Sequence, residues 1–244
     1  MTSDSSHTWP TWTRYALRDS HLDDAIAELN RENRCTRKLA SLRHRLLTGT
    51  ALPPADRPKR WDEANVVELL RDAPHEVRII DHGGYNSPGP WALARLGFRN
   101  VEAIDLNPRL PASPLSRRVR YSCQNMMQTA YADGSHDVIV SGSTVEHGVD
   151  WDVWLAECRR ILRPGGLLYV STDLVHDTVD TGEFEAFGLP WTPLRPKDLA
   201  DASKRFGLHG FSEPALEPVD LPDRLPITFL GQQCGFIAYA VTAV

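Results

Sequence analysis

Hydrophobic and polar residues follow one another along the chain in a pattern that predicts alternating helices and strands. The clearest helix covers Asp150–Leu162, where apolar residues recur every three or four positions, with aspartates at its start and arginines at its end. Proline and glycine residues at 164–166 end it. The same periodicity predicts further helices over 21–47, 61–72, 91–96 and 197–206. Short apolar runs predict strands over 77–80, 101–105, 136–141, 167–172 and 236–244.

This alternation predicts an α/β protein in which a mostly parallel, doubly wound sheet carries helices on both faces. Residues 53–60 read as a linker by their proline content. We therefore expect an N-terminal helical extension over 1–55 and an α/β domain over 56–244. The helix over 21–47 would either join two copies of the chain as a homodimer or cover a pocket, and the sequence leaves both open.

The composition is that of a globular protein, since 41% of the 244 residues are hydrophobic and 24% are charged. A net charge of −5 gives no general attraction for nucleic acids or anionic membranes, so we expect neither as a partner. The four cysteines lack a metal-binding spacing, and the N-terminus lacks the apolar run of a signal peptide. A cytoplasmic protein with reduced thiols is the expectation.

Candidate chemistry begins where the first two strands of the α/β domain end. The stretch DHGGYNSP places Asp81, Gly83 and Gly84 after the first strand, and Asp105 ends the second strand, 24 residues after Asp81. In a doubly wound sheet these two positions anchor a nucleoside. Because the full G-x-G-x-x-G pattern is absent, the glycines alone fit either a cofactor loop or an ordinary turn.

Further motifs follow in the order Asp133-Gly134-Ser135-His136-Asp137, then Val145-Glu146-His147, then Glu157 through Gly166. With the loop after the first strand, this order resembles class I S-adenosylmethionine-dependent methyltransferases, in particular the methyltransferase-11-like group. The resemblance covers about residues 76–175 closely. It implies a Rossmann-like methyltransferase domain whose last strand is antiparallel. It also implies S-adenosylmethionine as the cofactor, with S-adenosylhomocysteine as its product.

The resemblance further implies roles for single residues. Asp105 would hold the ribose, and Leu106 would lie beside the adenine. Asn125 would contact the adenine amino group, and Met126 would contact its ring nitrogen through the backbone N–H. The methionine end of the cofactor would be lined by Asp81, Gly83, Gly84 and Tyr85, and the cofactor would rest on Ser141 and Ser143.

The chain departs from the family pattern at several of these positions. Tyr85 and Ser87 replace the second and third loop glycines, so the backbone needs a wider path or the tyrosine points into the substrate pocket. Asn125 stands where an acid is usual, and it can still accept a hydrogen bond. Some ubiquinone-pathway O-methyltransferases bind a divalent metal through E-x-x-E-H. Ser143 occupies the first Glu position here, so no metal is expected.

Three residues on the same rim of the sheet are candidates for catalysis. His147 follows the fourth strand, where it would act as a general base or shape the turn. Asp173 and His176 follow the fifth strand, as a base with an orienting partner or as part of a polar loop. Aromatic residues near the N-terminus would either form a lid over the acceptor or pack the N-terminal helix onto the core: Trp9, Trp12 and Tyr15.

These observations predict methyl transfer to oxygen or nitrogen of a small molecule, such as a bacterial secondary metabolite or a sugar. An alternative is a protein that keeps the S-adenosylmethionine fold without methylating, such as a cyclase, a regulatory subunit or a binding subunit. A nicotinamide-dependent oxidoreductase on the same type of sheet is disfavoured by the missing third glycine and by the order of the later motifs.

Overall fold

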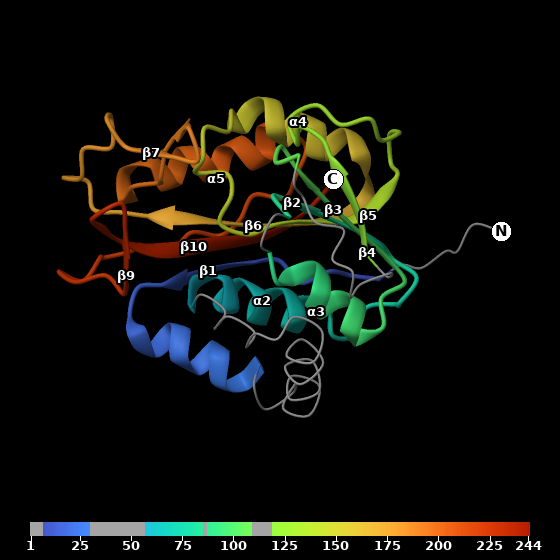
Figure 1. Ribbon diagram of the computed structural model, residues 1–244, viewed down its shortest axis with the longest axis horizontal. Coiled ribbons are helices and arrows are strands. Elements are labelled where there is room, and N and C mark those ends of the chain that lie inside the picture. Colours follow the sequence, from blue (N-terminus) through green and yellow to red (C-terminus); the bar gives the residue numbers. More distant parts are fainter. Residues whose placement is uncertain (1–6, 30–56, 85–86, 109–118) are drawn as a thin grey trace.

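The computed structural model describes residues 7–29, 57–84, 87–108 and 119–244 (Figure 1). One eight-stranded sheet runs through it in the order β1-β10-β6-β5-β2-β3-β4, and β9 pairs with β10 beside this path. Its strands are β1 (Trp12–Ala16), β2 (Arg78–His82), β3 (Asn100–Asp105), β4 (Val119–Cys123), β5 (His136–Ser141), β6 (Leu162–Leu174), β9 (Ile227–Phe229) and β10 (Gln232–Thr242). A separate hairpin is formed by β7 (Glu185–Ala186) and β8 (Leu189–Pro190).

Strands β2 to β6 run parallel, whereas β10 pairs with β6 in the antiparallel direction. The expected mostly parallel sheet with an antiparallel last strand is confirmed. The chain passes from β2 outward to β3 and β4, and then returns to the other side of β2 for β5 and β6. The strand order therefore reverses between β2 and β5, which is where open α/β sheets bind their ligands.

Helices cover both faces of this sheet (Figure 1). α2 (Arg57–Leu70), α3 (Gly89–Leu96) and a helical stretch over 19–29 lie on one face. α4 (Trp151–Ile161) and α5 (Leu199–Leu208) lie on the other face. The expectation of a doubly wound sheet is confirmed by this arrangement. None of the helices in the described ranges is both long and apolar enough to cross a membrane.

α4 shows how local sequence signals position an element. The Asp150 carboxylate begins the helix by accepting hydrogen bonds from the backbone N–H groups of Asp152 and Val153, at 3.0 and 3.2 Å. Trp154 and Leu155 point inward and are fully buried. The observed helix lies within the predicted range 150–162. A short 3₁₀ helix, η1 (Pro196–Asp198), directly precedes α5.

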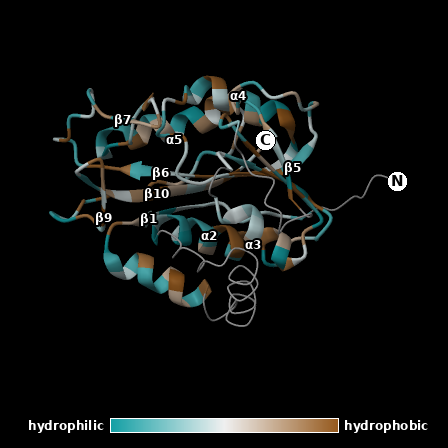
Figure 2. Cartoon of the chain, in the orientation of Figure 1, coloured by the Kyte–Doolittle hydropathy of each residue, from teal (hydrophilic) through white to brown (hydrophobic). Residues whose placement is uncertain are grey.

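The central strands carry apolar residues on both faces. Ile79 and Val138 join the core under α2 and α3, whereas Ile80 and Ile139 join the core under α4 and α5. Successive side chains of a strand point to opposite faces, and both faces are covered, so neighbouring residues serve different cores. Figure 2 shows hydrophobic segments in the central strands and a mixture of hydrophobic and hydrophilic residues on the helices.

Several element boundaries differ from the sequence-based predictions. α2 begins at Arg57, so residues 57–60 are helical and not part of a linker. β6 begins at Leu162, before the predicted 167, because it continues directly from the end of α4. The apolar pattern does not predict β4 or the short strands β7, β8 and β9, which carry many partly exposed positions.

The N-terminal segment contains the largest difference. β1 pairs antiparallel with β10 and forms an edge of the sheet, so part of the segment 1–55 belongs to the sheet and not to a helical extension. Residues 21–29 of the helix predicted over 21–47 are helical, and the remainder lies outside the described residues. The pattern missed β1 because its five residues include a threonine and an arginine among aromatic side chains.

The aromatic residues of this segment contact the body of the protein. Trp9 is buried, and Trp12 packs edge-on against Tyr169 of β6 with ring centroids 6.1 Å apart. The Tyr15 hydroxyl lies 3.5 Å from the Glu217 carbonyl oxygen. These contacts agree with the packing alternative for the three aromatic residues.

Candidate functional site

The loops after β2 and β5 touch each other at the point where the strand order reverses. Gly83 has a φ of 88°, and a Cβ placed on it would lie 2.3 Å from Thr144 Oγ1. A Cβ on Gly84 would lie 2.6 Å from the Cβ of Ala103 in β3. The N–H groups of both glycines donate to the Ile104 carbonyl at 2.9 Å. Both positions therefore exclude a side chain. The loop after β2 packs closely between β3 on one side and the loop after β5 on the other.

Asp81 is the next-to-last residue of β2 and lies on the side of the sheet that faces α3. Its carboxyl is buried, and its Oδ2 accepts a hydrogen bond from Ser87 Oγ at 2.8 Å. Burial raises the pKa of Asp81 to about 7. A cationic group beside it would be favoured, because the cation would stabilise the carboxylate where water does not. Tyr85, predicted to lie nearby, is outside the described residues.

The carboxyl end of β3 has the features of a nucleoside-binding edge. Asp105 Oδ1 accepts a hydrogen bond from the Asn107 N–H at 2.8 Å, which orients the carboxylate at the strand end. Leu106 is 56% exposed, which leaves an apolar surface beside the acid. The two residues thus offer an acceptor for hydroxyl groups and a surface for a flat ring.

Asn125 and Met126 follow β4 next to this edge, because the Gln124 N–H donates to the Asp105 carbonyl at 3.1 Å. Asn125 Oδ1 already accepts a hydrogen bond from the Met127 N–H at 2.9 Å. A carboxamide oxygen has two lone pairs, so this atom can accept one more. Met126 is buried.

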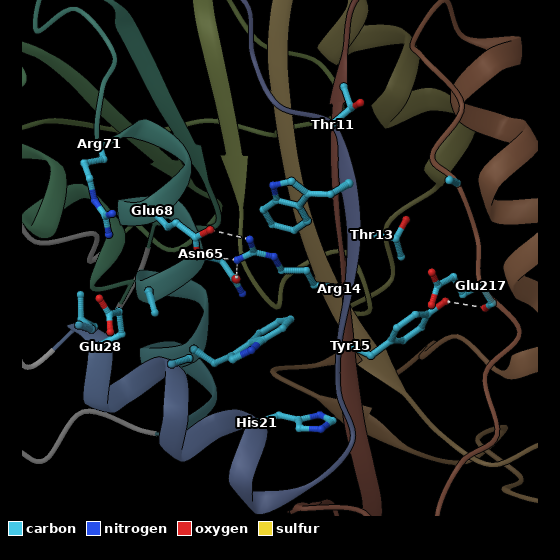
Figure 3. A pocket seen from close by; sticks show the side chains of 16 residues that line it. Thr11, Thr13, Arg14, Tyr15, His21, Glu28, Asn65, Glu68, Arg71 and Glu217 are labelled. Atoms are coloured by element: carbon cyan, nitrogen blue, oxygen red, sulfur yellow. Dashed lines mark hydrogen bonds and ion pairs between the residues drawn. The ribbon is translucent and has the colours of Figure 1, made fainter.

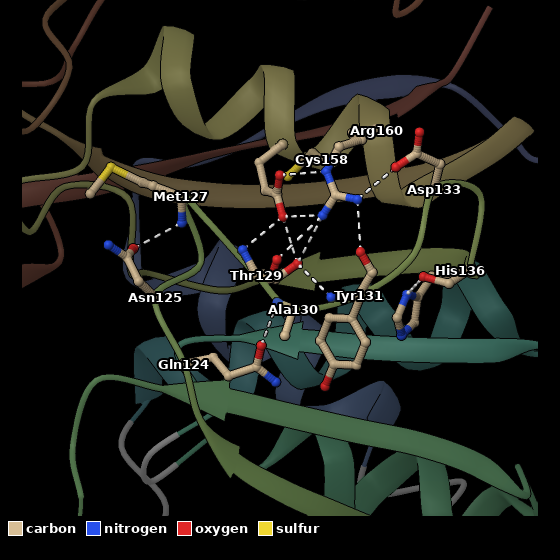
Figure 4. A network of polar contacts seen from close by, with 12 residues as sticks. Gln124, Asn125, Met127, Thr129, Ala130, Tyr131, Asp133, His136, Cys158 and Arg160 are labelled. Carbon is tan, nitrogen blue, oxygen red and sulfur yellow. Dashed lines mark hydrogen bonds and ion pairs between the residues drawn. The ribbon is translucent and has the colours of Figure 1, made fainter.

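A network of polar contacts holds the segment after Met126 against α4 (Figure 4). Glu157 accepts hydrogen bonds from the Thr129 N–H at 2.8 Å and from two nitrogens of Arg160. Arg160 also donates to Asp133 and to the Tyr131 carbonyl, both at 2.7 Å. Burial alone would raise the pKa of Glu157, but the hydrogen bonds from Arg160 and Thr129 lower it to about 2. Glu157 and Arg160 therefore hold the segment over residues 129–133 against α4.

Ser141 ends β5 with its side chain facing the core. It is fully buried, and its hydroxyl donates to the His82 carbonyl at 3.3 Å. Val140 belongs to the core under α2, so strand alternation turns Ser141 toward α4. Any cofactor contact from Ser141 would have to come from its backbone.

His147 lies in an aromatic environment beyond the loop after β5. Its ring meets Phe187 edge-on at a centroid distance of 5.3 Å, and Phe229 at 6.0 Å. Its Nδ1 is buried without a hydrogen-bond partner among the described residues. Burial lowers the pKa of His147 to about 4, and the charge of Lys59 acts in the same direction. The imidazole is therefore neutral at pH 7 and able to accept a proton.

Two buried acids are linked to His147: Glu146 directly, with its Oε1 3.9 Å from His147 Nε2, and Asp173 through Trp191. Asp173 Oδ2 accepts a hydrogen bond from Trp191 Nε1 at 2.8 Å, and Glu146 Oε2 accepts one from Thr172 Oγ1 at 3.2 Å. Burial raises the pKa of both acids, and the charge of Asp173 raises that of Glu146 further. His147 pairs with Trp191 in an isolated antiparallel bridge, so the segment around Trp191 joins the histidine to Asp173.

His176 takes a different position from the other two catalytic candidates. Its Nε2 lies 3.1 Å from the Pro222 carbonyl oxygen, which ties it to the segment before β9. Two residues of α2 that the sequence did not indicate, Lys59 and Asp62, do reach the loop after β5. Their three-residue spacing places both on one face of the helix, but an isolated sequence gives no sign that this face meets a loop.

A cavity of about 740 Å³ lies apart from these residues, along β1 and α2 (Figure 3). Its lining contains the ion pair of Arg14 and Glu68, with Nη2 and Oε1 2.6 Å apart. None of the residues predicted to bind the cofactor or to act in catalysis lines it. Within the ranges that the structure describes, no group of three or more histidine, cysteine, aspartate or glutamate residues is arranged to hold a metal ion.

Residues 86–170 match a family model described as a methyltransferase domain. The chain is similar to the methyltransferase GfsG of Streptomyces halstedii, with 31% identity over 136 residues that cover 52% of this chain and 48% of that protein. It is also similar to a ubiquinone biosynthesis O-methyltransferase of Mesorhizobium japonicum, with 33% identity over 101 residues that cover 39% and 41% of the two chains. The chain spans about half the length of the curated relatives it matches.

Solved structures share the fold at lower identity. The 1,6-didemethyltoxoflavin-N1-methyltransferase of Burkholderia thailandensis, solved with S-adenosylhomocysteine, has a TM-score of 0.55 and 15% identity, with 77% of this chain and 78% of that chain covered. The cyclase SpnF has a TM-score of 0.58 and 17% identity, with 76% and 82% covered. Residues 86–170 therefore match the methyltransferase domain family, and the sheet that they help to build shares its fold with a methyltransferase solved with S-adenosylhomocysteine.

Proposed function

We propose that this protein transfers a methyl group from S-adenosylmethionine to an oxygen or nitrogen atom of a small molecule. One juxtaposition carries the proposal. The nucleoside-type edge, with Gly83 and Asp105, lies at the ends of β2 and β3. The candidate bases lie on the neighbouring parallel strands, with His147 in the segment after β5 and Asp173 next to the last residue of β6, not beyond the strand as the sequence predicted. A cofactor and an acceptor bound on this rim would therefore meet.

The described residues fit the cofactor. An ammonium group, as on the methionine portion, would stabilise the buried Asp81 carboxylate, whose pKa is raised to about 7. Asp105 would accept hydrogen bonds from the ribose hydroxyls, and Leu106 would cover one face of the adenine. When bound, the cofactor would supply a methyl group on a positively charged sulfur, where it is open to attack by a nucleophile.

His147 and Asp173 would remove the proton that the acceptor loses as it gains the methyl group. His147 is neutral above about pH 4 and has a buried nitrogen without a partner among the described residues. Asp173 has a raised pKa, so it loses its proton and becomes a carboxylate at a higher pH than an ordinary aspartate does. A base whose pKa lies near the working pH is the effective kind, which favours Asp173, with a pKa of about 7, over His147, with a pKa of about 4.

The relatives support this acceptor chemistry without identifying the acceptor. One is named as acting on oxygen in ubiquinone biosynthesis, and one structure is named for methylation of a nitrogen. GfsG comes from a Streptomyces species, which agrees with a bacterial secondary metabolite as the acceptor class. The aromatic side chains Phe187 and Phe229 beside His147 favour an acceptor with an apolar or ring-shaped part over a small, fully polar one.

Calorimetric titration with S-adenosylhomocysteine, with NAD as the control, tests the cofactor. We expect micromolar binding of the first alone, and Asp105→Ala should abolish it while the unfolding midpoint stays close to that of the native chain. Full affinity in Asp105→Ala would refute the ribose assignment. Binding of neither compound would refute the proposed cofactor.

Methyl transfer itself is tested by supplying S-adenosylmethionine with panels of phenols, hydroxylated polyketides, sugars and amines. Asp173→Asn keeps an acceptor for Trp191 Nε1 but cannot take up the proton, so it should lower turnover without changing cofactor affinity. His147→Ala should do the same if the histidine is the base. Tight cofactor binding without methylation of any acceptor would favour the alternative of a cyclase or a binding subunit on this fold.

A further inference from the structure

Ser143 holds an uncommon backbone conformation in the loop after β5. Its φ is 48°, in the left-handed region that residues other than glycine rarely adopt. Such a conformation persists only where surrounding contacts hold it, and it concentrates at functional sites. The contacts around Ser143 therefore indicate what keeps this loop in place.

Three neighbours hold Ser143. Its N–H donates to the Ser171 carbonyl at 3.2 Å and lies 3.0 Å from Ser171 Oγ. Its hydroxyl donates to Asp62 Oδ2 at 2.9 Å. Lys59 Nζ donates to the Ser143 carbonyl at 3.3 Å and to the Gly142 carbonyl at 3.0 Å. The backbone N–H, the carbonyl and the side chain of Ser143 are thus all engaged.

Asp62 is the centre of this arrangement. It is 6% exposed, and its Oδ1 accepts hydrogen bonds from the Tyr169 hydroxyl at 2.9 Å and the Ser171 hydroxyl at 2.5 Å. Two hydroxyl groups of β6 therefore orient Oδ1, and the hydroxyl of Ser143 in the loop orients Oδ2. A Cβ on Gly142 would lie 3.0 Å from Asp62 Oδ2, so the loop backbone packs directly on this carboxylate.

The loop that α2 holds in this way lies between the two halves of the site. Thr144 contacts the Gly83 position of the cofactor loop, and its hydroxyl donates to the Gly142 carbonyl at 3.1 Å. The chain then continues through Glu146 to His147, the candidate base. A shift at Ser143 would displace the wall of the cofactor loop and the candidate base together.

We propose that Asp62 and Lys59 are positioning residues that brace the loop over residues 142–144 and thereby set the affinity for the cofactor. The inference rests on the proposed function, because it assigns the braced loop to the cofactor site. Asp62 acts through Ser143, because its buried carboxylate accepts the hydrogen bond from the Ser143 hydroxyl. Lys59 donates hydrogen bonds to two carbonyl oxygens of the loop, and its positive charge favours the ionised form of Asp62.

A rescue experiment separates bracing from a general effect on stability. Asp62→Ala removes the brace, and we expect the dissociation constant for S-adenosylhomocysteine to rise about tenfold or more, as for the loss of hydrogen bonds to a charged group. Glycine adopts a positive φ without support. The double variant Asp62→Ala with Ser143→Gly should therefore recover most of the lost affinity, although it leaves the Tyr169 and Ser171 hydroxyls without their acceptor.

Two milder variants cover the case in which Asp62→Ala does not fold. Asp62→Asn keeps the size of the side chain and removes its charge, and Lys59→Met keeps the apolar stem and removes the ammonium. Each should raise the same dissociation constant several-fold. Lys204→Met is the matched control, because Lys204 is exposed and pairs only with Asp201 at 3.5 Å among the described residues. It should leave the affinity unchanged.

The outcomes are distinguishable. Loss of affinity in Asp62→Ala with recovery in the double variant supports the bracing role. Unchanged affinity in Asp62→Ala, or in both milder variants where Asp62→Ala is not folded, overturns it. Loss without recovery in the double variant also overturns it, since the effect would then come from the altered core. If the native chain itself binds no S-adenosylhomocysteine, the proposed function falls first and this inference falls with it.

Discussion

Adding one methyl group at Gly83 tests the contact between the loop after β2 and the loop after β5. In Gly83→Ala the new Cβ would lie 2.3 Å from Thr144 Oγ1 and 2.4 Å from Thr144 Cγ2, so the loops have to separate. The residue would also keep a φ of 88°, which disfavours any side chain. The substitution therefore adds a steric cost to a backbone cost.

The magnitude follows from these two terms. A left-handed backbone costs a residue other than glycine roughly 1–2 kcal/mol. Overpacking a closely packed position costs about 1–3 kcal/mol more. We expect the free energy of unfolding to fall by about 2–5 kcal/mol in total, and cofactor affinity to fall with it because the displaced loop is the one that would contact the methionine portion.

Urea unfolding of matched variants separates the two terms. Gly231 has a φ of 78° and no heavy atom within 4 Å of a Cβ built on it, so Gly231→Ala should show the backbone cost alone. Thr144→Ala in the Gly83→Ala background removes the two nearest atoms and should recover part of the loss. If Gly83→Ala is no more destabilising than Gly231→Ala, or if Thr144→Ala recovers nothing, the loops do not pack as described.

Three further predictions concern stability. Asp150→Ala should lower the free energy of unfolding by about 1 kcal/mol and Asp150→Ser by much less, since serine also caps helices; equal losses in urea unfolding would contradict the capping role. Trp154→Ala should cost about 3–5 kcal/mol, because it empties a fully buried site and removes the donor to His82 Nδ1 at 3.1 Å; a thermal unfolding shift of only one or two degrees would be inconsistent with that packing. The folded pKa of Glu157 is about 2, below its ordinary value of 4.5, so its contribution is present above pH 4.5 and is lost as the pH falls toward 2. Glu157→Gln should therefore be less stable than the native chain at pH 6, with a difference that shrinks at pH 3, and a constant difference would show that the charge is not responsible.

The positions of the candidate cofactor residues in the fold were largely predictable from the sequence, because they depend on where strands end. Gly83 and Asp105 follow apolar runs at the spacing that a doubly wound sheet requires, and both stand at the ends of the observed strands β2 and β3. Ser141 shows the limit of this reasoning. Its position at the end of β5 was predicted, but only the alternation of β5 against two covered faces turns its hydroxyl into the core.

The raised pKa values of the two acids near the candidate base could not be predicted from the sequence. Glu146 and Asp173 have raised pKa values because the segment around Trp191 and the sheet remove them from water. That burial brings together residues that are far apart in the chain. The same residue types on an exposed loop would have ordinary pKa values.

The fold class follows from the sequence alone, since local periodicity and strand-end motifs are properties of neighbouring residues. The predicted bounds of α4 and β5 agree closely with the observed ones, because helix capping and apolar patterning act over a few neighbouring positions. The tertiary structure alone decided that β1 closes an edge of the sheet, and that Asp62 of α2 meets Ser143 across 81 residues of chain. Such contacts depend on how the elements pack and what they bury, and a one-dimensional pattern does not record either.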